Sequence, residues 1–227
     1  MTRTIGCYHA HYSNIDYIQQ AMEPFDVELV HFVDPGFDRR KSDAAFPVET
    51  AQARIQDTLV WVESAHVDAI LVTCTFFTAH MPDSDALPVS IPVVRIDDPL
   101  FEAICAEGRP PLLVFTNPAT VDGTVRRLIQ YAEGRGMELP VRTHLLEGTF
   151  DILMRGDKET YLSKVTEGLM NLAAEHPDHQ LWAAQLSMAG AAGRAEEAAG
   201  VRIGDPLSEL SRYMEKGLQL KPRPRTS

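Results

Sequence analysis

Short segments of β-type residues alternate with longer segments of helical period along the whole chain, and this alternation constrains the fold more than any other feature. Strands joined by crossover helices lie parallel, because each helix carries the chain back to the start of the next strand. The predicted strands are residues 3–8, 27–33, 68–73, 91–96, 111–116, 139–145, 180–185 and 200–203. The pattern therefore predicts an α/β fold with mainly parallel sheets.

Apolar residues recur at spacings of three and four between these strands, as expected for helices that cover a sheet. The clearest stripes are Val48, Ala51, Ile55, Leu59 and Val62, then Val121, Val125, Leu128 and Ala132, and finally Leu162, Val165, Leu169 and Leu172. No Gly/Ser linker or low-complexity stretch divides the chain.

An internal repeat indicates how the elements are organised. VVRIDDPLFEAI, residues 93–104, aligns with GVRIGDPLSELS, residues 200–211, with seven matches in twelve positions. Two strand-turn-helix units that both begin a helix at Asp-Pro could match by chance. The simpler interpretation is two α/β halves of similar topology.

Charge and composition exclude several classes of partner. The formal net charge of -11 argues against nucleic acid, which requires a clustered basic surface. The one basic segment, KPRPRTS at residues 221–227, is predicted to be a frayed terminus. The longest apolar runs reach only about half the length of a membrane-spanning helix, so no membrane insertion is expected. Three cysteines without paired spacing, and no recognisable secretory leader, favour a cytoplasmic protein.

Ligands of parallel α/β sheets bind beyond the carboxyl ends of the strands. The polar residues at these predicted ends lie in CYHAH (7–11), TCT (73–75), TNPAT (116–120) and QLSM (185–188). Cys74 follows an apolar strand, and the amides of a following helix would lower the pKa of its thiol. A buried packing role for this cysteine is the alternative. Cys7 and Cys105 are predicted to be structural.

Hydroxyl and amide groups at the strand ends suit a small anionic ligand held by neutral donors. Threonines at strand ends also commonly cap the next helix, so both roles stay open for Thr75, Thr116 and Thr120. His9 and His11 would share a face of a strand, but no HExxH motif or cysteine cluster supports a metal site. We therefore expect no metal and no cofactor.

Taken together, these segments resemble the aspartate/glutamate racemase superfamily, which includes hydantoin racemases, maleate isomerases and arylmalonate decarboxylases. The resemblance covers nearly the whole chain and rests on the order and spacing of IGCYHAHYS, VDAILVTCTFFTAH, VFTNPATVDGTVRRLIQYAEGRG, EGTFDILMRGDKETY and LWAAQLSMAGAA. It implies two similar α/β lobes related by a pseudo-twofold axis, with the active site in the cleft between them. The lobes would comprise residues 1–105 with 205–227, and residues 106–204.

The resemblance also implies a cofactor-independent reaction at the carbon α to a carboxylate, with one cysteine from each lobe. The first cysteine falls on Cys74, whereas the second position is Ser187. A serine hydroxyl without an adjacent base is too weak to exchange a carbon-bound proton near neutral pH. Residues implied to bind substrate are His9, Thr75, Thr116, Thr120, Gln185 and Met188.

Three reactions remain open for such a site. Cys74 could act with a nonstandard partner, such as a histidine, in a racemase; it could protonate the enediolate left by a decarboxylase; or it could attack a double bond in an isomerase. The expected partner is a small carboxylate, either an amino acid or a dicarboxylate, and the chain could form a homo-oligomer. A binding protein without activity is the alternative class.

Overall fold

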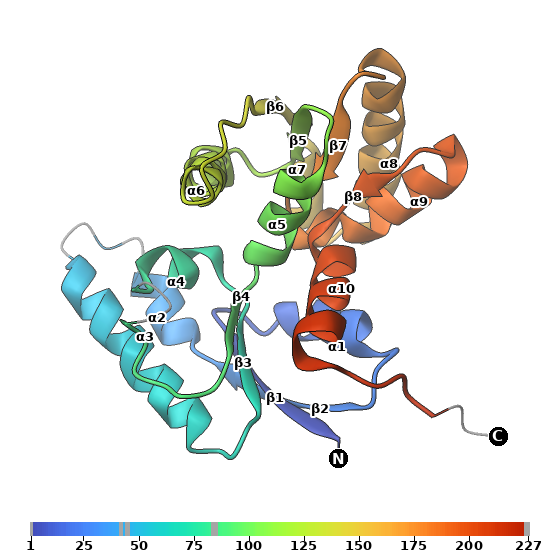
Figure 1. Ribbon diagram of the computed structural model, residues 1–227. Helices are drawn as coiled ribbons and strands as arrows, with labels where there is room; N and C mark the ends of the chain where they lie inside the picture. Colours follow the sequence, from blue (N-terminus) through green and yellow to red (C-terminus); the bar gives the residue numbers. More distant parts are fainter. Residues whose placement is uncertain (1, 41–42, 44–45, 83–85, 225–227) are drawn as a thin grey trace. The chain divides into compact units, whose positions relative to one another are not determined.

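The structure is a computed structural model that describes residues 2–40, 43, 46–82 and 86–224. Two four-stranded parallel sheets have the orders β2-β1-β3-β4 and β6-β5-β7-β8 (Figure 1). The strands are β1 (Arg3–His9), β2 (Val27–Val33), β3 (Ala69–Val72), β4 (Val93–Arg95), β5 (Pro111–Phe115), β6 (Arg142–Leu145), β7 (Gln180–Ala183) and β8 (Ile203–Gly204). All eight predicted strands are present, and the two sheets share one topology. The predicted α/β fold with two similar lobes is confirmed.

Helices connect the strands in the alternation that the sequence predicts. They are α1 (Asn14–Met22), α2 (Pro35–Arg40), α3 (Val48–Glu63), α4 (Thr75–His80), α5 (Asp98–Ala106), α6 (Val121–Glu133), α7 (Thr149–Met154), α8 (Lys158–Glu175), α9 (Ala189–Ala199) and α10 (Pro206–Leu218), with short 3-10 turns η2 (Pro118–Thr120) and η3 (Leu186–Met188). The chain divides into two compact units, residues 1–98 with 210–227, and residues 99–209.

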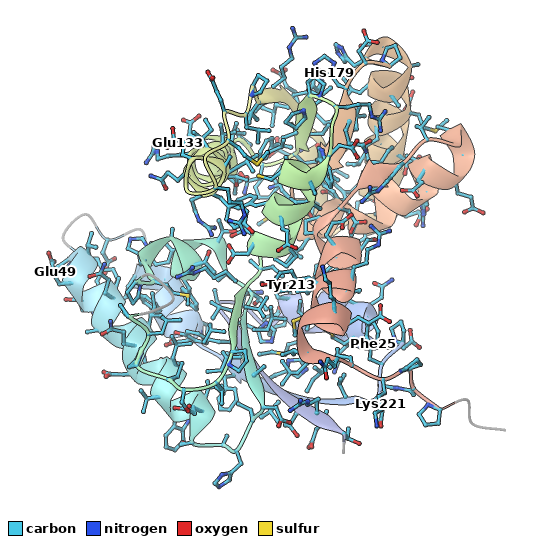
Figure 2. The ribbon with its side chains drawn as sticks, viewed as in Figure 1. Phe25, Glu49, Glu133, His179, Tyr213 and Lys221 are labelled. Carbon is cyan, nitrogen blue, oxygen red and sulfur yellow. The ribbon has the colours of Figure 1, made fainter. Side chains whose placement is uncertain are left out.

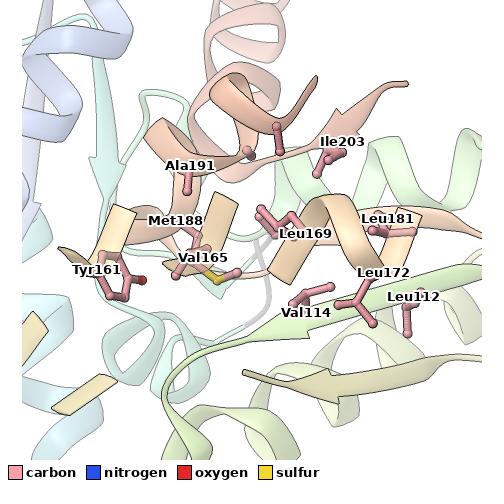
Figure 3. Packing of buried hydrophobic residues seen from close by; sticks show 13 residues of the cluster. Leu112, Val114, Tyr161, Val165, Leu169, Leu172, Leu181, Met188, Ala191 and Ile203 are labelled. Carbon is pink, nitrogen blue, oxygen red and sulfur yellow. The ribbon is translucent and has the colours of Figure 1, made fainter. Parts of the chain in front are cut away.

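The second unit buries both faces of its sheet. Successive side chains of a strand point to opposite faces, so Leu112 and Val114 lie on one face while Leu113 and Phe115 lie on the other. The first pair packs with α8 and α9 in the cluster drawn in Figure 3. The second pair packs with α5, α6 and the buried Trp182. This double coverage explains why β5 is apolar at every position.

The first unit follows the same rule. Tyr8, Ile70 and Val72 pack against Ala51, Ile55, Leu59 and Val62 of α3 on one face of the sheet. Cys7 and His9 alternate with Tyr8 along β1 and therefore lie on the other face, where both are fully buried. The predicted structural role of Cys7 stays a prediction, with which its burial is compatible.

The sequence repeat corresponds to equivalent places in the two sheets. Residues 93–104 form β4 and the start of α5, and residues 200–211 form β8 and the start of α10. Each of these strands is the last of its sheet, next to the strand that precedes it in the chain. The repeat therefore reflects shared topology.

Two local predictions were wrong. Val48 is 52% exposed, because it begins α3 and the apolar stripe meets the sheet only from Ala51 onward. The basic tail is paired as far as it is described: Asp26 N donates to the carbonyl of Lys221, and Phe25 forms an antiparallel bridge with Pro222. Phe25 and Lys221 lie beside each other in Figure 2. Residues 225–227 lie outside the described residues.

The buried carboxylate of Asp205 starts α10. Its Oδ1 accepts hydrogen bonds from Leu207 N at 2.9 Å and Ser208 N at 3.1 Å, and Pro206 occupies the first helical position. Burial raises the pKa of Asp205, so removal from water outweighs the helix amides that favour the charged form.

Replacing Asp205 by asparagine should therefore make stability less sensitive to pH. A carboxyl whose folded pKa is raised contributes stability below its unfolded pKa of 3.8, and this contribution is lost as pH rises through the folded value. Asparagine keeps the cap without the charge. In urea denaturation across pH 4 to 8, the Asp205→Asn protein should gain stability relative to wild type as pH rises, and then level off. A relative loss with rising pH would contradict the burial of a charged group. Asp205→Ala, which removes the cap, should cost about 1 kcal/mol at every pH.

None of the helices in the described ranges is both long enough and apolar enough to span a membrane.

Candidate active site

Cys74 stands where β3 ends and α4 begins. The four residues of β3 are fully buried, whereas Cys74 is half-buried and takes part in no disulfide. Its backbone is extended, with φ -114° and ψ 120°, and it occupies the N-cap position of α4. The thiol therefore lies at the carboxyl end of an apolar strand, the location that the sequence predicted.

The residue before this cysteine is tied to two other elements. Thr73 Oγ1 lies 2.8 Å from His9 Nδ1 at the end of β1. The Asn14 amide, in the first turn of α1, donates to Thr73 O at 3.3 Å and to Thr73 Oγ1 at 3.4 Å. The chain position that leads into Cys74 is therefore fixed from β1 and from α1.

His9 is buried and lies behind this position. It is 0% exposed, and its Nε2 lies 2.8 Å from His31 Nδ1 on β2. Burial, with a smaller contribution from His31, lowers the pKa of His9 to about 4, so the ring is neutral at neutral pH. The sequence predicted substrate binding for His9; in the structure its side chain is fully buried and contacts Thr73 and His31.

The other two histidines that the sequence left open are bonded locally. His11 is exposed and its Nδ1 lies 2.9 Å from Ser13 Oγ. His80 Nδ1 lies 2.8 Å from the carbonyl of Phe76 on the same helix, to which it donates. Of the three, only His9 is linked to the residue that precedes Cys74.

An acid that the sequence did not single out lies beside the start of α4. Asp97 follows β4, and its carboxylate accepts hydrogen bonds from Thr75 Oγ1 at 3.4 Å and Thr78 Oγ1 at 3.1 Å. The Thr75 hydroxyl, predicted to bind substrate, donates to this carboxylate. Asp97 comes directly after the predicted strand 91–96, so the rule that ligands bind at strand ends could have identified it.

The polar residues predicted in the second unit are brought together around Gln185. Gln185 Oε1 accepts from Thr116 N at 2.7 Å, Thr116 Oγ1 at 2.8 Å and Asn117 N at 3.1 Å. Its Nε2 donates to Thr120 Oγ1 at 3.1 Å, and Thr120 Oγ1 donates to Asn117 O at 2.9 Å. Gln185 thus binds the end of β7 to the end of β5 through four contacts, a geometry that leaves its orientation well defined.

Tyr161 on α8 extends this network to Ser187, and the sequence did not indicate it. Its hydroxyl lies 3.2 Å from Thr116 Oγ1 and 2.9 Å from Ser187 Oγ. Tyr161 is 1% exposed, and burial raises the pKa of its phenol above the usual range. It is therefore a neutral hydroxyl at neutral pH, able to donate one hydrogen bond and to accept others.

The hydrogen bonds of this network run in one direction. Thr116 Oγ1 gives its only proton to Gln185 Oε1, so Tyr161 must donate to Thr116. Ser187 then donates to Tyr161, and its hydroxyl keeps only lone pairs for another partner. In this arrangement Ser187 can only accept a hydrogen bond from a further partner, and the protons of Thr116 and Thr120 are used within the network.

Met188 belongs to the hydrophobic core. It is 0% exposed and packs with Val165, Leu169 and Ala192 in the cluster of Figure 3. The sequence placed it with the substrate-binding residues because it follows a strand end, but the 3-10 turn η3 directs its side chain inward. Half-buried Ser187, one residue earlier, is at the polar side of the same turn.

Comparison with solved structures bears on the fold. No protein-family model and no curated protein matches the chain. An aspartate racemase homologue from Pyrococcus horikoshii OT3 has a TM-score of 0.70 at 14% identity, covering 96% of this chain and 100% of its own. Glutamate racemase isoform RacE1 from Bacillus anthracis has a TM-score of 0.64 at 18% identity, covering 96% and 82%.

Allantoin racemase from Pseudomonas fluorescens is also similar, with a TM-score of 0.59 at 13% identity over 99% of each chain. Sequence identities this low support a shared architecture but give no information about the substrate. The resemblance seen in the sequence is thus confirmed for the architecture: the chain has the two-sheet α/β fold of the glutamate, aspartate and allantoin racemases.

Proposed function

We propose that this protein is a racemase-type enzyme that exchanges the proton on the carbon α to a carboxylate in a small amino acid or dicarboxylate. The observation that carries the proposal is Cys74, a half-buried thiol at the carboxyl end of β3 in a chain with the fold of racemases. In its thiolate form Cys74 would take the α-proton, and the thiol so formed would return a proton to the carbon. The proposed reaction uses neither pyridoxal phosphate nor a metal ion.

Fixed surroundings support this role for Cys74. Thr73 and the start of α4 are held by Asn14, His9 and Asp97 through contacts between 2.8 and 3.4 Å. A general base must be held in one geometry relative to the carbon it deprotonates, since misplacement by about 1 Å can cost about 100-fold in rate.

In this proposal the polar network of the second unit supplies groups that bind the substrate. With its proton given to Tyr161, Ser187 can only accept from a further partner, so it suits a substrate N–H or O–H, such as an ammonium group. This favours an amino acid over a dicarboxylate. Ser187 is not a base in this proposal, because its proton is directed to the neutral Tyr161.

The same hydrogen bond favours a second candidate reaction. A lyase that decarboxylates a substituted malonate needs one thiol, which protonates the enediolate left when carbon dioxide departs. Only Cys74 would be required, and Ser187 bonded to Tyr161 would have no part in proton transfer. Carbon dioxide release from a substituted malonate, without racemisation of amino acids, would identify this reaction.

Replacing Ser187 by cysteine tests whether position 187 takes part in the reaction. A thiol at position 187 would supply the second acid/base, so Ser187→Cys should raise the α-proton exchange rate at least about 10-fold, with inversion of configuration. The measurement is deuterium incorporation and chirality of amino acids incubated in deuterium oxide. Ser163→Cys, an exposed position on α8, is the matched control and should leave the rate unchanged. Equal rates in all three proteins would contradict the proposed place of Ser187.

A further inference from the structure

Three potential metal ligands gather on one face of the first sheet. Cys7 and His9 are two residues apart on β1, so their side chains point to the same face. His31 on β2 is the direct register partner of Cys7. One ligand atom from each residue lies within 4.8 Å of the other two. Strand pairing thus brings a thiol and two imidazoles together from segments that are far apart in the sequence.

The hydrogen bonding of this cluster is incomplete. The Cys7 and His9 side chains are 0% exposed. Cys7 Sγ has the carbonyl of Ile5 at 3.8 Å, a long contact, and His31 Nε2 is a buried atom with no hydrogen-bond partner among the described residues.

The tautomer of His9 suits a metal ligand. Thr73 Oγ1 donates to the carbonyl of Tyr8 at 3.3 Å, so His9 Nδ1–H donates to Thr73 Oγ1 at 2.8 Å. His9 Nε2 then carries a lone pair directed into the cluster. Metal-bound histidines typically donate their second ring N–H to a fixed acceptor, which orients the ring, and Thr73 supplies that acceptor.

We infer that Cys7, His9 and His31 form a binding site for a zinc-class transition metal ion. One thiolate and two imidazoles match the ligands of Zn²⁺, whereas Mg²⁺ and Ca²⁺ prefer oxygen. The His9 Nε2 and His31 Nδ1 atoms, 2.8 Å apart, need only separate to about 3.3 Å for tetrahedral ligation. The inference is independent of the proposed enzymatic reaction, and it revises the expectation from sequence that no metal binds.

Binding of the metal ion would release one proton from the protein. The Cys7 thiol gives up its proton to solvent when its sulfur bonds to the metal. The proton on His31 Nδ1 moves to the unpartnered Nε2 of the same ring, so the ring stays neutral. The site then carries a net charge of +1 for a divalent ion. The metal would join β1 to β2 and hold His9 against Thr73.

Metal titration of the intact protein tests the inference. Protein treated with a chelator and then given Zn²⁺ should retain one equivalent through gel filtration, by elemental analysis, and its melting temperature should rise. Cys7→Ser and His31→Gln should each weaken Zn²⁺ binding at least about 10-fold. His11→Gln, an exposed histidine near the end of the same strand, is the matched control and should bind like wild type. No retained zinc in wild type, or equal affinity in Cys7→Ser, would overturn the site.

Cobalt identifies the sulfur ligand even if the Cys7 variant fails to fold. The Cys74→Ser/Cys105→Ser protein keeps Cys7 as its one thiol. With Co²⁺ it should show the near-ultraviolet charge-transfer band of thiolate bonded to cobalt, at the wild-type intensity. Absence of the band in this protein would show that Cys7 does not bond to the metal and would refute the site.

Discussion

The Cys74→Ala protein should lose α-proton exchange by at least about 1,000-fold while remaining folded. General acid/base groups contribute about 10²- to 10⁴-fold, and alanine can neither accept nor return a proton. Stability should change by no more than about 1 kcal/mol, because the side chain is half-buried and makes no cap hydrogen bond to α4. Exchange in deuterium oxide and urea denaturation measure the two quantities.

Cys105→Ala is the matched control for this substitution. Its thiol is also half-buried, but it lies on α5 in the second unit, and burial raises its pKa. Its exchange rate should equal that of wild type. An active Cys74→Ala protein would end the assignment of Cys74, and loss of activity in both variants would indicate a structural cause instead.

The Gly204→Ala protein should be destabilised by about 3 kcal/mol. Gly204 on β8 is the register partner of Trp182 on β7, and an added Cβ would lie 2.1 Å from Trp182 Cε3. Trp182 is 0% exposed and packs with Phe101, Phe115 and Leu128, so the indole has no space into which to move. Urea denaturation gives the change in the free energy of unfolding.

Gly193→Ala provides the matched control. Gly193 lies within α9, and an added Cβ there would meet no atom within 4 Å. Alanine at this position should stabilise the protein by up to about 1 kcal/mol, since it restricts the unfolded chain and favours helix. If Gly204→Ala had wild-type stability, the packing of Trp182 over β8 would be incorrect.

The fold could be predicted from the sequence because its signals are local. Each strand is a short apolar run and each helix carries a stripe, so all eight strands were found, with ends within a few residues of the observed ones. The stripe on α3 shows the limit of this reasoning. Val48 has the correct spacing, but it lies in the first turn and beyond the sheet.

The candidate site could be predicted only where its residues sit at strand ends. Thr116, Gln185 and Ser187 were found because parallel strands bring their carboxyl ends to one edge of a sheet. Tyr161 reaches Ser187 from a helix 26 positions earlier in the chain, and no local pattern marks it. The same holds for Asn14 at Thr73.

The histidine pair shows how register decides what sequence cannot. His9 and His11 have the i, i+2 spacing that suggests a shared strand face, but β1 ends at His9 and His11 is exposed. The residue that meets His9 is His31, and it does so because Cys7 pairs with His31 across β1 and β2. Strand register depends on the packing of the whole sheet, so it was not readable from either segment alone.

The most direct test of the central claim is loss of the α-proton signal, followed by nuclear magnetic resonance, when the wild-type protein is incubated with small amino acids in deuterium oxide. The account predicts that the signal of at least one amino acid disappears with wild-type and Cys105→Ala proteins and persists with Cys74→Ala. Persistence of every signal with the wild-type protein, or equal loss with Cys74→Ala, would contradict proton exchange by the Cys74 thiol.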